Sequence, residues 1–486
     1  MPPLLRAAAL LTLVASPVAR AQVALVADLA PGVASSHPSA LAATPDTLYF
    51  AADADGAGYA LWRYAPSAGL PERVPGLALD DDHLLVGPTL PHGSRLYATT
   101  LALIDGGSTA TALWSLDPTS GVAALVDDEI SPYVAPFLFD GRVHFVDRSE
   151  EGWGLNALDP STGAVQAVRA APFGAAPAEF TAYDGRLFFR AAPDAHSTDH
   201  ELWALDPATG EVAEAADLRS DGGSYPTGLT VYADRLYFTA NVEGEGGGEL
   251  WSYDAATGEA SLAADIAPGL WASHPRALTV YDGRLFFFAG SEGYERELWA
   301  FDAAVGTADR VATLGAFSLD LGGMAVYDER LFFALPSDGL WMHDAATGMT
   351  AGVAPSVQPR ELVPFAGRLF FAGSSDDLGA ELWAYSSPLA TPTAPTHAPD
   401  AVRLSAPYPN PTRGVATFTL ALGVPQHVRL TVHDALGREI TVLHDGMLPA
   451  AEHFYHLDGE ALPQGMYFVR AAAETITATQ RVTVVR

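Results

Sequence analysis

The sequence contains no cysteine and no lysine, and each absence excludes a class of function. Without cysteine the chain forms no disulfide, no thiol nucleophile and no zinc–thiolate site. Its 26 basic residues are all arginines, set against 58 acidic residues, which gives a formal net charge of −32. Because phosphate binding requires a basic patch, we expect neither a nucleic-acid partner nor attraction to anionic membranes. Such a surface favours solubility and cationic partners.

Long hydrophobic runs are also missing. The run after Arg6 ends at about Ala15, which is too short to cross a bilayer, so we expect no transmembrane segment. Residues 1–21 instead match a secretory signal peptide. Ala19 and Ala21 form the small-x-small cleavage site, and Gln22 becomes the first residue of the exported chain.

What the sequence does contain is a repeat. The stretch GGELWSYDAATGE (247–259) recurs as HELWALDPATGE (200–211) and RELWAFDAAVGT (296–307), with weaker copies along residues 22–386. The tryptophan position of each copy is Trp62, Trp114, Asn156, Trp203, Trp251, Trp299, Trp341 and Trp383, at spacings of 42 to 52 residues. A period of this length is typical of a propeller or a similar repeat array.

Each repeat predicts four strands. In residues 226–265 these are 226–232, 235–240, 249–254 and 259–265, separated by turn sequences. Asp-Gly turns such as Asp184-Gly185 indicate two-residue hairpins, because both residues tolerate positive φ. The apolar-aromatic triplets of the second strand, such as Leu285-Phe286-Phe287, also occur eight times. Two markers therefore predict an all-β, eight-bladed propeller of four-stranded blades, with seven blades as the alternative.

The two ends of the array predict how the ring closes. The last unit stops after its third strand, at 381–386. Residues 23–38 (VALVADLAPGVASSHP) parallel 261–275 (SLAADIAPGLWASHP), which follow a third strand. We therefore expect the N-terminal strand to complete the last blade, which would remove open sheet edges. His37, Tyr225 and His274 occupy equivalent positions, and this interchange favours a structural role for them.

Residues 22–386 resemble the bacterial ELWxxDGT repeat proteins, a family of expected β-propellers. The resemblance rests on Glu-Leu-Trp-x-x-Asp, on an Asp-Leu/Ile-x-Pro-Gly segment and on a Ser-x-Pro segment. After the aspartate this chain has Ala/Pro-x-Thr-Gly instead of Gly-Thr. The resemblance implies no particular activity.

Residues 387–402 are rich in Pro, Thr and Ala and are expected to form a linker. Residues 403–486 contain short alternating strands that predict a small β-sandwich. This segment resembles the type A C-terminal sorting domain of the type IX secretion system. The matching residues are Tyr408, Pro409, Asn410, Pro411, Gly414, Gly437, Gly465 and Tyr467. The resemblance implies export through the periplasm to the cell surface or medium, with the secretion machinery as partner and later removal of the domain.

Candidate ligand sites are few. The loops between second and third strands are acidic, and Asp53 and Asp55 form a fragment of a calcium-loop pattern. Asp194, His196, Asp199 and His200 form the densest group of potential metal ligands. Solvated loops are the simpler interpretation of both groups, so we expect no cofactor other than possible calcium. The repeated tryptophans are best explained by packing between blades.

No catalytic motif is recognisable, so we favour a non-enzymatic protein. The leading hypothesis is a secreted or surface-displayed binding module, monomeric, that recognises a glycan or a protein through its long-loop face. The alternative is a secreted polysaccharide hydrolase or lyase with carboxylates in the propeller channel. A hydrolase would bring two or three carboxylates into one pocket, with a raised pKa. A binding module would instead expose aromatic side chains on its loops.

Overall fold

The computed structural model describes two stretches of the chain, residues 22–387 and 403–485, with short gaps. The gaps are residues 32–33, 55, 57, 78–82, 86, 105–107, 170–172, 195–196, 198, 243–246, 269–271, 292–294, 317–322, 336–337, 355–356, 376–377, 405–411, 413–414, 423–425, 435–437, 449–451, 460–461 and 474–476. The expected signal peptide and nearly all of the expected linker lie outside the described residues. The described residues contain no helix long or apolar enough to cross a membrane.

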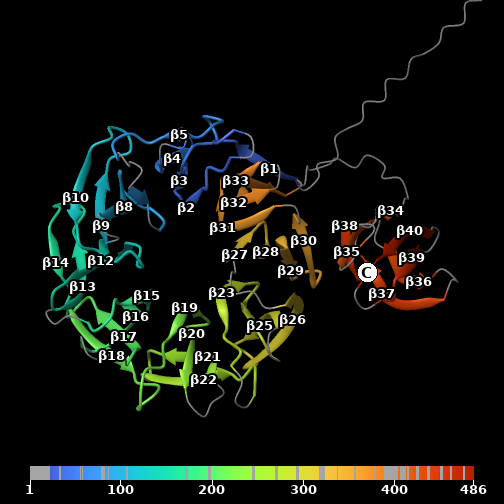
Figure 1. The fold of residues 1–486 in the computed structure, drawn as a ribbon. Coiled ribbons are helices and arrows are strands. Elements are labelled where there is room, and N and C mark those ends of the chain that lie inside the picture. The colour runs from blue at the N-terminus through green and yellow to red at the C-terminus, as the bar shows by residue number, and fades with distance from the viewer. Residues whose placement is uncertain are drawn as a thin grey trace, which may run out of the picture.

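Eight antiparallel sheets follow one another around a ring (Figure 1). Blade 1 is β2 (Ser39–Ala43), β3 (Leu48–Ala52), β4 (Ala60–Tyr64) and β5 (Glu72–Arg73). Blade 2 is β6 (His83–Leu85), β7 (Leu90–His92), β8 (Arg95–Ile104), β9 (Ser108–Leu116) and β10 (Ala123–Asp127). Blade 3 is β11 (Phe137–Phe139), β12 (Arg142–Ser149), β13 (Gly152–Leu158) and β14 (Val165–Ala167). Blade 4 is β15 (Ala178–Tyr183), β16 (Arg186–Ala191), β17 (Glu201–Asp206) and β18 (Glu211–Ala216).

The second half of the ring repeats the pattern. Blade 5 is β19 (Thr227–Tyr232), β20 (Arg235–Val242), β21 (Gly247–Asp254) and β22 (Glu259–Ala264). Blade 6 is β23 (Arg276–Tyr281), β24 (Arg284–Ala289), β25 (Glu295–Asp302) and β26 (Thr307–Ala316). Blade 7 is β27 (Met324–Tyr327), β28 (Arg330–Leu335), β29 (Gly339–Asp344) and β30 (Met349–Ala354). Blade 8 is β31 (Gln358–Phe365), β32 (Arg368–Ser375), β33 (Gly379–Ser386) and β1 (Gln22–Ala27). The count of eight is confirmed.

The N-terminal strand closes the ring, as the repeat predicted. β1 pairs antiparallel with β33, and Val23 lies opposite Tyr385. Strands from the two ends of the propeller therefore share one sheet, and blade 8 has no vacant outer position. One irregularity was not predicted. The inner strand of blade 2 is split, so that β6 and β7 pair with different halves of the long strand β8.

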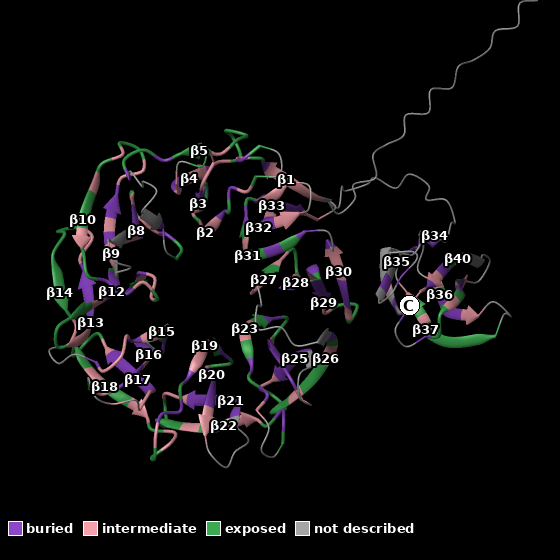
Figure 2. Ribbon diagram, in the orientation of Figure 1, coloured by how far each residue is buried: buried purple, intermediate pink, exposed green. Residues whose placement is uncertain are grey.

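The second strands are buried on both faces because each blade lies between two others. In β24, Leu285 and Phe287 pack with side chains of blade 5, whereas Phe286 and Phe288 pack with side chains of blade 7. Alternate residues of a strand point to opposite faces, so a continuous apolar run serves two interfaces. Figure 2 shows buried residues gathered on the second and third strands of the blades.

The turns at one end of the blades have the predicted chemistry. Asp282 (φ 47°) and Gly283 (φ 71°) both adopt the left-handed conformation that a two-residue hairpin turn requires. In the Asp-x-x-Thr-Gly turn, the Asp254 carboxylate accepts a hydrogen bond from the amide of Ala256 at 2.9 Å, and Gly258 has a φ of 74°. All connections between first and second strands and between third and fourth strands lie on this end, which we name the tight-turn face.

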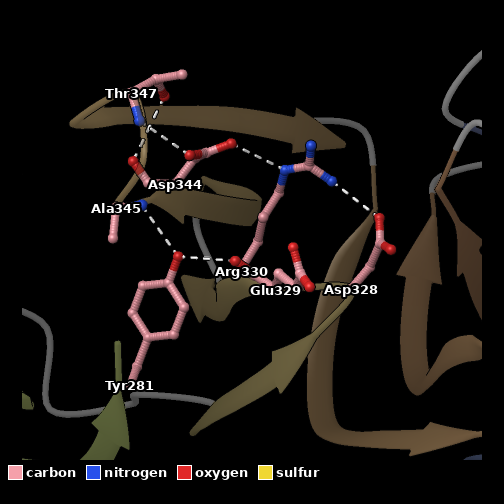
Figure 3. Close-up of polar contacts among 7 residues, drawn as sticks. All are labelled: Tyr281, Asp328, Glu329, Arg330, Asp344, Ala345 and Thr347. Atoms are coloured by element: carbon pink, nitrogen blue, oxygen red, sulfur yellow. Dashed lines mark hydrogen bonds and ion pairs between the residues drawn. The ribbon is translucent and has the colours of Figure 1, made fainter. Parts of the chain in front are cut away.

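Tyrosines on the tight-turn face link neighbouring blades (Figure 3). The hydroxyl of Tyr281, at the end of the inner strand of blade 6, donates to the carbonyl of Glu329 in blade 7 at 2.9 Å. It also accepts a hydrogen bond from the amide of Ala345 at 2.9 Å. Tyr183, Tyr232 and Tyr327 make the same two contacts at their own junctions. These tyrosines of the tight-turn face thus hold neighbouring blades together.

The C-terminal segment is a two-sheet sandwich, as expected. One sheet has the order β34 (Arg403–Leu404), β35 (Val415–Ala421) and β38 (Glu452–Asp458). The other has the order β37 (Glu439–Leu448), β36 (Gln426–Asp434), β39 (Gly465–Ala473) and β40 (Thr477–Val484). Phe418 of the first sheet and Val469 of the second belong to one buried core, which joins the two layers.

Candidate binding surfaces of the propeller

The glutamate of the Glu-Leu-Trp motif is a structural residue. Glu249, at 0% exposure, accepts hydrogen bonds from the amide of Ile266 at 2.9 Å, the amide of Ser273 at 2.9 Å and the hydroxyl of Ser273 at 2.6 Å. Ile266 belongs to the Asp-Leu/Ile-x-Pro-Gly segment and Ser273 to the Ser-x-Pro segment. The three motifs of the repeat therefore meet at one carboxylate, an arrangement we call the glutamate staple.

The staple recurs in two other blades. Glu201 accepts from the amide of Leu218 and from the amide and hydroxyl of Ser224. Glu381 accepts from the amide of Leu29 and from the amide and hydroxyl of Ser36. The staple of Glu381 joins the two ends of the propeller, because Glu381 is in the last blade and its partners belong to the N-terminal segment.

The staple was not recognised from the sequence, although a signal for it exists within the repeat. The units with Glu201 and Glu249 are followed in the sequence by a Ser-x-Pro segment, and the last unit, with Glu381, meets the Ser36-His37-Pro38 segment across the closure of the ring, whereas no Ser-x-Pro segment follows the unit with Ala60. In blade 6 no Ser-x-Pro segment follows, and Glu297 binds Arg310 at 2.6 Å instead.

Burial changes the pKa of these glutamates. It raises the pKa of Glu201 to about 7 and raises that of Glu249, against the opposing hydrogen bonds from Ser224 and Ser273. Burial would also raise the pKa of Glu297, but the hydrogen bonds from Arg310, Ser291 and Trp299 outweigh it and lower the value. A raised pKa often marks a catalytic acid. Here the carboxylates are saturated by donors of their own blade, so the shift reports structural burial.

The side chain after each staple serine also has a structural position. Tyr225 (φ 51°) and His274 (φ 46°) adopt the left-handed conformation, and their amides donate to the carbonyls of His200 and Gly248. His37 makes the equivalent contact with Ala380. These contacts agree with the structural role expected from the sequence.

Three of the repeated tryptophans clearly pack between blades, as expected. Trp251 belongs to a buried cluster with Leu202 of blade 4, and Trp383 to one with Leu340 of blade 7. Trp203 is 7% exposed and packs against Phe173. These indoles are not arranged as an open stacking platform.

The predicted metal ligands are divided between two distant blades. The Asp53 carboxylate accepts a hydrogen bond from the amide of Gly56 at 2.9 Å in blade 1. Asp194 is exposed in blade 4, where Asp199 and His200 are partly buried. Asp55 and His196 lie outside the described residues. Within the described part of the chain, no three acidic or histidine side chains are grouped so that they could hold a metal ion. Calcium binding stays a prediction.

The end of the propeller opposite the tight-turn face carries the connections between blades and the loops between second and third strands. We name it the long-loop face. Among the described residues, two exposed tyrosines lie on it, Tyr133 (88% exposed) and Tyr225 (41% exposed). Tyr225 stacks on the ring of His200 with centroids 4.9 Å apart. Burial lowers the pKa of His200, so this imidazole is neutral at pH 7.

The segments that carry these tyrosines also carry groups of carboxylates. Burial raises the pKa of Asp127, and repulsion from Asp147, Asp128 and Glu129 adds to the effect. Asp127, Asp128 and Glu129 precede Tyr133 in the same stretch of the chain, and we call these residues and Asp147 the Tyr133 patch. Burial also raises the pKa of Glu214, with repulsion from Asp217 and Asp199. Asp199, Glu214, Asp217, His200 and Tyr225 form the Tyr225 patch. Within it, Asp199 Oδ1 and His200 Nδ1 are buried and have no hydrogen-bond partner among the described residues.

The described signature residues of the C-terminal domain stabilise its sandwich. Tyr467 is buried and donates to the carbonyl of Pro463 at 2.7 Å, and Gly465 opens β39 opposite Val484. Arg438 binds Asp434 at 2.7 Å and so joins the two ends of the turn between β36 and β37. Tyr408, Pro409, Asn410, Pro411, Gly414 and Gly437 lie outside the described residues.

Comparison with known proteins assigns this domain. Residues 406–485 match the family model of the secretion system C-terminal sorting domain. The C-terminal domain is a sorting domain. The protein is therefore exported to the cell surface through the type IX secretion system. Residues 198–386 of the propeller match the family model of the outer membrane protein assembly factor BamB.

No curated protein matches the chain. Similar solved structures include a prolyl endopeptidase, with a TM-score of 0.47 and 12% identity, covering 80% of this chain and 55% of that one. The computationally designed Ika8 protein has a TM-score of 0.40 and 11% identity, covering 83% and 97%. Acylaminoacyl peptidase from Pyrococcus horikoshii has a TM-score of 0.41 and 10% identity, covering 70% and 58%. The chain thus spans about half the length of the prolyl endopeptidase.

Proposed function

We propose that the propeller is a surface-displayed binding module that recognises a neutral or cationic polysaccharide through its long-loop face. The observation that carries this proposal is the exposure of Tyr133 and Tyr225 on that face, each in a segment that also carries a group of carboxylates. A tyrosine ring offers an apolar surface to a sugar ring, and carboxylates accept hydrogen bonds from hydroxyl or ammonium groups. The same charge repels anionic polymers.

The hydrolase alternative has less support. The carboxyl groups with raised pKa include Glu201, Glu249 and Glu361. The first two are saturated staples, and Glu361 on the inner strand of blade 8 accepts a hydrogen bond from the amide of Leu41 at 3.0 Å. These three groups lie in blades 4, 5 and 8 and do not share one pocket.

We also propose that residues 22–386 are a variant of the ELWxxDGT repeat type. The staple supports this assignment, because it gives the Glu-Leu-Trp motif and its two companion segments a shared structural purpose. In this view the repeat motif specifies the propeller, and the loops that differ between blades specify the ligand.

A glycan array probed with the labelled full chain tests the proposal. We expect binding to neutral or amino-sugar polysaccharides, and we expect Tyr133→Ala and Tyr225→Ala each to weaken it about tenfold, since aromatic anchors carry much of the energy of such sites. Leu70→Ser is the matched control, because Leu70 is 67% exposed on the tight-turn face. Binding that is unchanged in both tyrosine variants, or binding to a protein partner alone, would contradict the glycan proposal.

A further inference from the structure

A pocket of about 440 Å³ lies between the outer strand of blade 5 and the outer part of blade 6. Its walls include Ala264 and Asp265 from blade 5, and Trp299, Thr307 and Ala308 from blade 6. Figure 1 shows β22, β25 and β26 side by side at this junction. Trp299 is only partly buried, whereas Trp251 at the equivalent position is 9% exposed. The pocket thus has one aromatic wall, one carboxylate and small side chains that leave space.

At another junction between blades, the position equivalent to this pocket is occupied by an arginine side chain. At the junction of blades 3 and 4, the guanidinium of Arg169 lies over the ring of Trp203, 5.2 Å from its centroid. It also lies 4.4 Å from the centroid of Phe173 and donates to the carbonyl of Pro193 at 3.3 Å. Burial lowers the pKa of Arg169, yet an arginine remains charged at every physiological pH. A cation–π contact therefore occupies this junction.

Ala264 occupies the position in its repeat unit that Arg169 occupies in the unit of blade 3. Arg169 is the sixth residue after Gly163, and Ala264 is the sixth residue after Gly258. The pairing of third and fourth strands supports this equivalence. Ala167 lies opposite Asn156 and Leu262 lies opposite Trp251, and Asn156 and Trp251 are equivalent positions of the third strand. The short side chain of Ala264 lines the pocket together with the next tryptophan, Trp299, whereas the long side chain of Arg169 covers Trp203.

The charges around the pocket favour a cation. Asp265 is exposed at its edge. Arg310 lies opposite Trp299 in the β25–β26 pairing, but its guanidinium is bound by the buried carboxylate of Glu297 at 2.6 Å. The nearby positive charge is thus balanced, and Asp265 leaves the pocket negative. The whole chain, with a net charge of −32, adds a long-range attraction for cations.

We propose that this pocket binds a guanidinium group, the side chain of an arginine presented by a partner peptide, stacked on Trp299 beside Asp265. The bound group would repeat the contact that Arg169 makes with Trp203 inside the molecule. The site is on the rim of the propeller and does not depend on the long-loop face, so either proposal can fail while the other holds.

The test titrates the full chain with the blocked peptide acetyl-Gly-Arg-Gly-amide and follows the tryptophan indole resonances by NMR, with Trp299→Phe to assign the one at the pocket. The control peptide carries citrulline, which has nearly the shape of arginine without its charge. We expect a saturable shift of the Trp299 resonance with the arginine peptide and at least tenfold weaker binding of the citrulline peptide.

Three variants sharpen the result. Ala264→Arg should fill the pocket from within and abolish peptide binding. Asp265→Asn should weaken binding about two- to fivefold, as for an exposed ion pair. Asp309→Asn is the matched control, because Asp309 is exposed on β26 and pairs with Ala300, on the opposite face from Trp299. An unshifted Trp299 resonance, equal binding of both peptides, or unchanged binding by Ala264→Arg would overturn the proposal.

Discussion

Glu381 offers a direct test of how the propeller stays closed. Its carboxylate accepts hydrogen bonds from the amide of Ser36 at 2.9 Å, the hydroxyl of Ser36 at 2.7 Å and the amide of Leu29 at 3.0 Å. Glu381 and Ser36 are both 0% exposed. Replacing Glu381 by alanine leaves the buried amide and hydroxyl of Ser36 with only the carbonyl of Ala380 as acceptor, at 3.0 and 3.4 Å, whereas water can reach Leu29, which is only partly buried.

The expected cost follows from these contacts. A hydrogen bond to a charged group contributes about 1.5–3 kcal/mol, and the substitution removes two such buried bonds from Ser36, so we expect Glu381→Ala to lower the free energy of unfolding by about 3–5 kcal/mol. Unfolding entropy is about 2 cal/mol/K per residue, so a propeller of this size should lose about 4–6 °C in Tm. Glu381→Gln should cost less, because its amide oxygen still accepts from Ser36.

Glu249→Ala is the matched control, because it removes the same three hydrogen bonds within one blade and its connection. Its partners are 17 and 24 residues away, whereas those of Glu381 are 352 and 345 residues away. Both variants should lose similar stability, measured by thermal unfolding. Only Glu381→Ala should accelerate amide hydrogen exchange in β1, because only that staple holds the closing segment. Unchanged exchange in β1, or a Tm within about 1 °C of the native value, would refute this reasoning.

Four further predictions concern closure, pH, blade contacts and export. Deleting residues 23–28 should lower the Tm of the whole propeller, because blade 8 loses the strand paired with β33, and an unchanged Tm would argue against closure by β1. Glu201 has a folded pKa of about 7, above its ordinary value of 4.5, so the folded state binds this proton more tightly and stability should fall as pH rises from 4.5 to 7. Urea unfolding should show that the free energy of unfolding falls by about 2–4 kcal/mol between pH 4.5 and 8, and that Glu201→Gln reduces this fall. The same pH profile in the native protein and in Glu201→Gln would count against this role of Glu201. Tyr281→Phe removes the hydrogen bonds to Glu329 and Ala345 and should cost about 1–2 kcal/mol in chemical denaturation, whereas Tyr133→Phe should cost nothing measurable. Deleting residues 403–486 should leave a folded propeller in the periplasm, and cell fractionation that finds it on the surface would contradict the role of the sorting domain.

Most of the fold was predictable because a propeller repeats. The strands of blade 5 lie within two residues of those expected, since the turn residues at Asp254, Gly258 and the hairpins have strong local preferences. The divided inner strand of blade 2 was missed, because the pairing of β6 with the distal half of β8 depends on contacts that the repeat does not encode.

The candidate sites were less predictable. The two candidate metal groups, around Asp53 in blade 1 and around Asp199 in blade 4, were selected by composition, and metal binding by either group stays a prediction. The exposure of Tyr133 and Tyr225 was also invisible in the sequence, because an aromatic residue in a loop is as often buried as exposed, and only the packing of the surrounding connections decides which.

The sequence by itself determined the number of blades, the closing strand and the sorting domain, because each depends on local periodicity or on a comparison of one repeat with another. The tertiary structure alone decided what the repeated residues do. It brings Glu381 to Ser36 across 345 residues, and it leaves Trp299 beside an open pocket while Arg169 covers Trp203. Both outcomes arise because side chains from different blades meet only when the blades pack against one another.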